Sequence, residues 1–155
     1  MNLKIFGPIG PIARSVRPLV FALFLLLDRA AKFWAMSSLA RQPDGARRAF
    51  LSLGLYFNRG ISFSLLGGHD RLVLLASLAG LAVISLACAR SEKIRTMRGI
   101  PLLYAGAVGN LSDRLAYGYV IDWIYVGLHI NLADVWLCAG CALIAAELAK
   151  SPERA

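Results

Sequence analysis

Three aspartates lie in a strongly apolar part of the chain, between residues 109 and 136: Asp113, Asp122 and Asp134. An apolar setting favours the neutral form of a carboxyl group, because burial removes water from the charged form. Two carboxyl groups that share one proton can hydrolyse a peptide, one activating water as general base and the other protonating the substrate. Asp122 and Asp134 are the candidate pair. Asp113 is followed directly by Arg114, whereas Asp122 has apolar neighbours on both sides.

Asp134 also has a purely structural interpretation. It stands three residues after Asn131, where an apolar run begins. An acidic side chain in the first turn of a helix is stabilised by the helix dipole. The sequence alone leaves both interpretations of Asp134 open.

Other hydrolytic mechanisms lack their residues. Ser112 has no neighbouring general base, and no His-Glu-x-x-His zinc motif is present. Cys138 and Cys141 form a C-x-x-C pair, but a zinc site would need further ligands. We interpret these two cysteines, together with Cys88, as small packing residues. We therefore expect neither a metal nor another cofactor.

The composition indicates that a lipid bilayer surrounds these residues. Hydrophobic residues make up 58% of the 155 residues, and the mean hydropathy is +0.62. Four apolar segments approach the roughly 20 residues that a spanning helix needs. We expect a membrane all-α protein, a four-transmembrane-helix bundle with a small extracytoplasmic β-sheet element. A single domain over residues 1–155 would comprise a cytoplasmic tail, 1–17, and helices at approximately 18–36, 71–90, 99–115 and 131–149.

The small sheet is expected between the first two helices. The stretch FLSLGLYFNRGISFSLLGG, residues 50–68, combines aromatic and β-branched residues around a central Asn-Arg-Gly. This pattern indicates two short strands around a turn. The third connection, roughly residues 115–130, reads as an aromatic and glycine-rich loop.

The charges fit a membrane protein better than a nucleic-acid-binding protein. The net charge is +8, but the basic residues flank the spans, and more of them lie on the side of both termini. Basic residues in short loops favour the cytoplasm, so we expect both termini there. Six ionisable residues then lie toward the outer face: Asp28, Lys32, Asp113, Arg114, Asp122 and Asp134. Asp28 and Lys32, four residues apart, share a helix face, and we interpret them as an ion pair that braces a site on other helices.

Four motifs in order resemble those of bacterial lipoprotein signal peptidases, the signal peptidase II family. DRAAK, residues 28–32, resembles the family's D-x-x-x-K, and NRGISF, residues 58–63, resembles its N-x-G-x-x-F. GAVGNLSDRLAYGYVIDW, residues 106–123, resembles G-x-x-G-N-x-x-D-R followed by G-x-V-x-D. NLAD, residues 131–134, resembles N-x-A-D. The resemblance covers about residues 18 to 148.

The resemblance implies that Asp122 and Asp134 are the catalytic aspartates, and it assigns no metal. It places supporting or substrate-binding roles on Asp28, Lys32, Asn58, Gly60, Gly106, Asn110, Arg114, Asn131 and Ala133. We assign Asp113 to structure. The implied reaction removes signal peptides from diacylglyceryl-modified prolipoproteins by cleavage before the lipidated cysteine. The implied partners are the lipid-modified precursor, membrane lipids and an inhibitor of the globomycin type, with no nucleic acid. The implied location is the bacterial inner membrane, as a multi-pass protein with its active site at the outer, periplasmic face.

Three alternatives remain open from the sequence. Departures from the family pattern, such as Ile61, Ser62 and Ala105, allow a divergent paralogue with restricted substrates. A small transporter or proton-conducting bundle would use similar carboxylates, although the second apolar segment, residues 72–89, carries no charge. A membrane binding protein without catalysis is the third.

Overall fold

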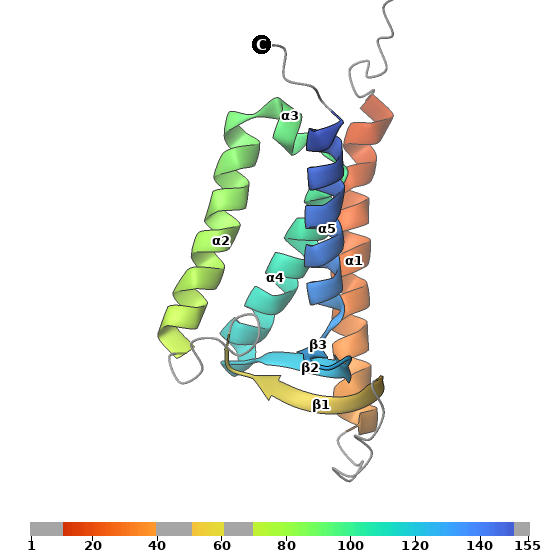
Figure 1. Ribbon diagram of the computed structural model, residues 1–155, viewed down its shortest axis with the longest axis vertical. Helices are drawn as coiled ribbons and strands as arrows, with labels where there is room; N and C mark the ends of the chain where they lie inside the picture. The colour runs from red at the N-terminus through yellow and green to blue at the C-terminus, as the bar shows by residue number, and fades with distance from the viewer. Residues whose placement is uncertain (1–10, 40–50, 61–69, 151–155) are drawn as a thin grey trace, which may run out of the picture.

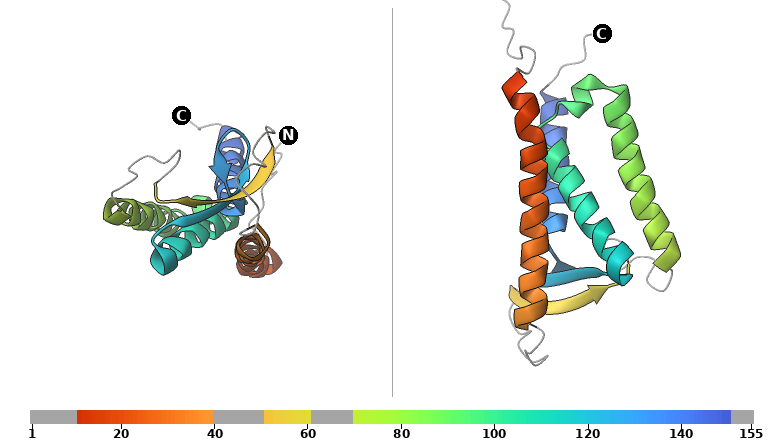
Figure 2. Two further views of the ribbon diagram at one scale, coloured as in Figure 1. Left: turned by 90° about the horizontal axis from the view of Figure 1, so that it is seen from below. Right: turned by 180° about the vertical axis from the view of Figure 1, so that it is seen from behind.

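The computed structural model describes residues 11–39, 51–60 and 70–150. Long helices run side by side, a small sheet lies across one end of them, and a short helix lies at the other end (Figure 1). In chain order the elements are α1 (Pro11–Leu39), β1 (Ser52–Asn58), α2 (Asp70–Arg90), α3 (Glu92–Arg95), α4 (Ile100–Tyr117), β2 (Val120–Tyr125), β3 (His129–Ile130) and α5 (Leu132–Ala149). The start of α1 and the end of α5 share the α3 end (Figure 2).

Helix α1 extends beyond both ends of the predicted range 18–36. Residues 11–17, which we expected in a cytoplasmic tail, are the first residues of this helix. The guanidinium of Arg17 donates to the carbonyls of Arg95 and Thr96, which ties this turn to the segment after α2. Apolar patterning could not reveal such a contact, because it is made by a charged residue outside the apolar run.

Two of the described helices, α2 and α5, are long and apolar enough to cross a membrane. Many large apolar side chains on the described helices are exposed, including Leu19, Phe33 and Val83, each at least 66% exposed. Apolar exposure on this scale marks a surface that contacts lipid or another protein. The helices therefore present a surface that suits a bilayer.

The sheet differs from the one that the sequence predicts. It has three antiparallel strands in the order β1-β2-β3, and Tyr56 of β1 lies opposite Asp122 of β2. The first predicted strand is present as β1, but its observed partner is β2, from the stretch that we read as a loop. Residues 61–69, where the second predicted strand falls, lie outside the described residues. The run VIDWIY in β2 is rich in β-branched and aromatic residues, which favour strands.

Helix α4 is the central element, and it packs against α1, α2 and α5. Glycine allows its close approach to α5. A Cβ built on Gly106 would lie 2.4 Å from the carbonyl oxygen of Ala133, and one on Gly109 would lie 2.8 Å from Oδ2 of Asp28. Small residues at such contacts let helix backbones approach closely in membranes. These two glycines thus bring α1, α4 and α5 together beside the polar residues.

The interpretation of the cysteines was right for one of three. Cys88 is buried with Met97 and Ile100. Cys138 and Cys141 are exposed, so for them it was wrong. The sequence shows that α5 is apolar along its length but does not show which face meets the other helices.

Candidate active site

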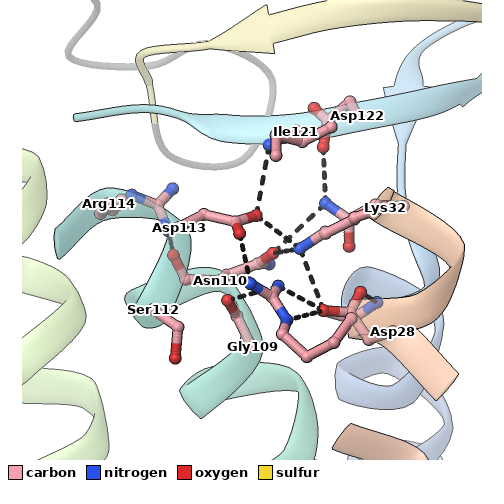
Figure 3. Close-up of polar contacts among 12 residues, drawn as sticks. Asp28, Lys32, Gly109, Asn110, Ser112, Asp113, Arg114, Ile121 and Asp122 are labelled. Carbon is pink, nitrogen blue, oxygen red and sulfur yellow. Dashed lines mark hydrogen bonds and ion pairs between the residues drawn. The ribbon is translucent and has the colours of Figure 1, made fainter. Parts of the chain in front are cut away.

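The candidate site lies where the sheet meets the ends of α1, α4 and α5 (Figures 1 and 3). Asp122 comes from β2, and Asp134 comes from the first turn of α5. Two asparagine side chains link them. Nδ2 of Asn131 lies 2.6 Å from Oδ1 of Asp122, and Nδ2 of Asn110 lies 2.8 Å from Oδ1 of Asp134. The asparagines also contact each other, Nδ2 of Asn131 donating to Oδ1 of Asn110 at 3.2 Å.

Asp122 is almost fully buried, with 1% of its surface exposed. Its second oxygen accepts from Nδ2 of Asn58 at 3.0 Å. Burial raises the pKa of Asp122 to about 6. The hydrogen bond from Asn58 lowers this pKa, while the nearby charge of Asp134 raises it. Asp122 is therefore a carboxyl group that takes up a proton at a higher pH than an ordinary aspartate does.

Asp134 has the structural role at the start of α5 that the sequence left open. Its Oδ2 accepts from the backbone N–H of Asn131 at 3.0 Å, and the Asn131 side chain accepts from the N–H of Asp134 at 3.1 Å. This reciprocal pair is a capping box that begins α5. The cap fixes the carboxylate beside Asn110, so Asp134 belongs to the same hydrogen-bonded network as Asp122.

An ion cluster lies behind the asparagines. Nζ of Lys32 lies 3.2 Å from Oδ2 of Asp28 and 2.7 Å from Oδ2 of Asp113, and it also contacts Oδ1 of Asn110 at 3.0 Å (Figure 3). Oδ1 of Asp28 accepts from the N–H of Ala133 at 3.0 Å, in the first turn of α5. The Asp28–Lys32 pair thus reaches both α4 and α5, as its bracing interpretation requires.

Arg114 and Asn58 hold the chain that follows β1. Nη2 of Arg114 donates to the carbonyl oxygen of Gly60 at 2.9 Å, and the N–H of Gly60 donates to Oδ1 of Asn58 at 2.9 Å. Asp113, which we assigned to structure, accepts from the N–H of Ile121 at 3.3 Å. Helix α4 therefore positions β1 through Arg114 and β2 through Asp113.

The residues to which the sequence assigns catalytic, supporting or bracing roles gather at this end of the molecule. Asp28, Lys32, Asn58, Gly60, Asn110, Asp113, Arg114, Asp122, Asn131, Ala133 and Asp134 are joined by the hydrogen bonds and ion pairs above, and Gly106 packs beneath them. Sequence reasoning missed Arg29, which contacts Asp28 and Asp113. The available signal was its position three residues before Lys32, on the same helix face.

Comparison with known proteins connects this arrangement to a family. The family model described as signal peptidase (SPase) II matches residues 20–150. A lipoprotein signal peptidase of Pseudoalteromonas translucida is 37% identical over 134 residues, covering 79% of this chain and 81% of that protein. One from Rhodopseudomonas palustris is 32% identical, covering 92% of this chain and 99% of that protein.

The fold is also found among solved structures. A bacterial membrane enzyme determined by the in meso method at 2.3 Å resolution superposes with a TM-score of 0.71 at 22% identity, covering 88% of each chain. A second, determined at 1.9 Å resolution, gives a TM-score of 0.67 at 22% identity and covers 89% of this chain and 95% of that one. The structural neighbours are membrane enzymes. The family model spans the candidate site from α1 to α5, and the chain therefore belongs to the signal peptidase II family.

Proposed function

We propose that this protein is an aspartic endopeptidase that removes signal peptides from diacylglyceryl-modified prolipoproteins, with cleavage immediately before the lipidated cysteine. Asp122 and Asp134 are its catalytic pair. The observation that carries the proposal is the pairing itself: Asn131 and Asn110 hold the two carboxyl groups in one hydrogen-bonded network. Relatives named lipoprotein signal peptidase support the substrate class.

The proposed setting is the bacterial inner membrane. Helices α1, α2, α4 and α5 would cross the bilayer, with both termini in the cytoplasm and the sheet at the outer face. The excess of basic residues on the side of the termini supports this orientation. The acyl chains of the precursor would stay in the bilayer beside the exposed apolar helix surfaces, while the scissile peptide reaches the sheet end. The single-domain organisation over residues 1–155 is part of the same proposal.

In the proposed mechanism, the carboxyl groups of Asp122 and Asp134 share one proton. In the reactive, singly protonated form, Asp122, whose pKa is raised to about 6 by burial, carries the proton, and ionised Asp134 accepts a proton from the attacking water. The water oxygen bonds to the scissile carbonyl carbon as Asp122 protonates the carbonyl oxygen. The C–N bond then breaks, and the amine of the lipidated cysteine leaves with the proton that Asp134 took up. Asp122 regains its proton from the collapsing tetrahedral hydroxyl group, which restores the starting state.

Processing of a matched pair of precursors tests the proposal. The full chain, purified in detergent, is given a diacylglyceryl-modified precursor and the same precursor without the lipid. We expect cleavage before the cysteine of the lipidated precursor only, and we expect globomycin to block it. Failure to cut the lipidated precursor, or equal cutting of the unlipidated one, would contradict the proposed substrate class.

A further inference from the structure

Arg29 has no role in any of the motifs, yet its guanidinium connects two helices. From α1, its Nη1 lies 2.5 Å from Oδ1 of Asp113, and its Nη2 lies 2.6 Å from Oδ2 of Asp28. Nη2 also donates to the carbonyl oxygen of Gly109 at 2.9 Å. Arginine suits this position because its planar fork presents several donors in a fixed geometry. Asp113 and Gly109 belong to α4, so Arg29 fastens α1 to α4.

The charges in this cluster balance only when Arg29 is counted. Asp28 and Asp113 are both fully buried, and among the described residues the cations that form ion pairs with them are Arg29 and Lys32. A buried charge without a partner is strongly unfavourable. Without Arg29, two buried carboxylates would depend on the single ammonium group of Lys32.

Lys32 has a further contact that matters for the site. Its Nζ donates to Oδ1 of Asn110 at 3.0 Å, and together with Nδ2 of Asn131 at 3.2 Å it turns this oxygen toward the ion cluster. The opposite end, Nδ2, then faces Asp134 at 2.8 Å. Movement of Lys32 toward the carboxylates would remove the charged one of the two donors that hold Asn110 in this orientation and leave Nδ2 of Asn131 alone.

We propose that Arg29 is a positioning residue for the peptidase reaction. By neutralising Asp28 and Asp113, it leaves Lys32 in contact with Asn110 and so keeps the Asn110 amide donor on Asp134. The inference rests on the proposed catalytic role of Asp134. Arg29 acts through Lys32 and Asn110, and its described side-chain contacts are with Asp28, Asp113 and Gly109.

The test compares four forms of the full chain with wild type on the lipidated precursor. Arg29→Met removes the charge, Arg29→Lys keeps it, and Arg29→Met with Asp113→Asn removes one charge of each sign. Arg98→Met is the matched control, because the Arg98 side chain is 82% exposed and pairs with Glu147, which is on α5. The readouts are kcat, KM, the pH profile of kcat/KM, and the melting temperature in detergent.

Arg29→Met is expected to lower kcat by about 10- to 100-fold, less than the loss of a whole acid or base because Arg29 acts indirectly, with KM within about twofold of wild type. Its pH profile is expected to move to higher pH, because a lost cation favours protonated carboxyl groups. The charged groups that act on Asp122 are Asp134 of α5, Lys32 of α1 and Arg114 of α4. When Arg29 is lost and Lys32 moves toward Asp28 and Asp113, the ionised form of Asp122 loses stabilisation by Lys32. Arg29→Lys and the double variant are each expected to have a kcat at least about tenfold above that of Arg29→Met. Arg98→Met is expected to behave as wild type in all four readouts.

Two results would overturn the inference. One is Arg29→Met with wild-type kcat and pH profile. The other is a loss of activity that is fully explained by a smaller amount of folded protein, with an unchanged pH profile and no recovery in the double variant. Inactive Asp122→Asn and Asp134→Asn beside a normal Arg29→Met would defeat this inference and leave the proposed function standing. Active dyad variants would defeat the proposed function instead.

Discussion

Asp122→Asn and Asp134→Asn are each expected to lower cleavage of the lipidated precursor by about 10²–10⁴-fold, the usual contribution of one acid or base. An amide can neither accept the proton of the attacking water nor supply one to the scissile carbonyl. Expression and membrane insertion are expected to persist, because neither substitution alters an apolar helix surface. The measurement is the initial rate of signal-peptide release by purified protein, normalised to folded protein.

The control for these variants is Asp70→Asn. The Asp70 side chain is 48% exposed and lies 3.5 Å from Arg59, outside the proposed catalytic pair. Its rate is expected to equal that of wild type. Asp122→Asn carries an additional cost, because its amide would meet the donors of Asn58 and Asn131, whose oxygens are already engaged. Normal processing by either dyad variant would remove that aspartate from the mechanism.

Asp28→Ala is expected to lower both thermal stability and activity. The carboxylate is fully buried, pairs with Arg29 and Lys32, and accepts from the N–H of Ala133. Its removal leaves a buried cation short of a partner, which costs about 3–5 kcal/mol when a buried pair is broken. The measurement is the melting temperature in detergent, together with the processing rate.

Asp28→Asn is the matched variant for this position. It keeps an acceptor for the N–H of Ala133 but removes the charge, so its melting temperature is expected between those of Asp28→Ala and wild type. A melting temperature of Asp28→Ala equal to wild type would contradict the bracing role of Asp28.

The residues that the sequence singled out for the candidate site lie together in the structure, and for some of them a physical signal was available. Ionisable groups at membrane depth are costly, so Asp28, Lys32 and Asp122 stand out against apolar neighbours. Asn58 is different, because it lies 64 residues from its partner Asp122 and is an ordinary strand-end residue by itself. It was found through the family motif and not through its local chemistry.

The parts that the sequence did not predict depend on contacts between distant segments. Strand β1 pairs with β2, a strand that is far away in the sequence, whereas the local pattern around Asn58 favoured a hairpin between neighbouring strands. Arg29 was overlooked because its neighbour Asp28 offers a local charge partner, which hides its contact with Asp113 on α4. Local patterns report local partners, and these features have distant ones.

The central claim is that Asp122 and Asp134 act as one unit that shares a proton, and titration of Asp122 tests it most directly. The measurement is the ¹³C chemical shift of the Asp122 carboxyl carbon against pH in full-length protein, assigned by its loss in Asp122→Asn. We predict a pKa of about 6 in wild type, against an ordinary 3.8, because burial and the charge of Asp134 disfavour ionisation. We also predict a lower value in Asp134→Asn, which lacks that charge. A wild-type pKa near 3.8, or a pKa that Asp134→Asn leaves unchanged, would contradict the account.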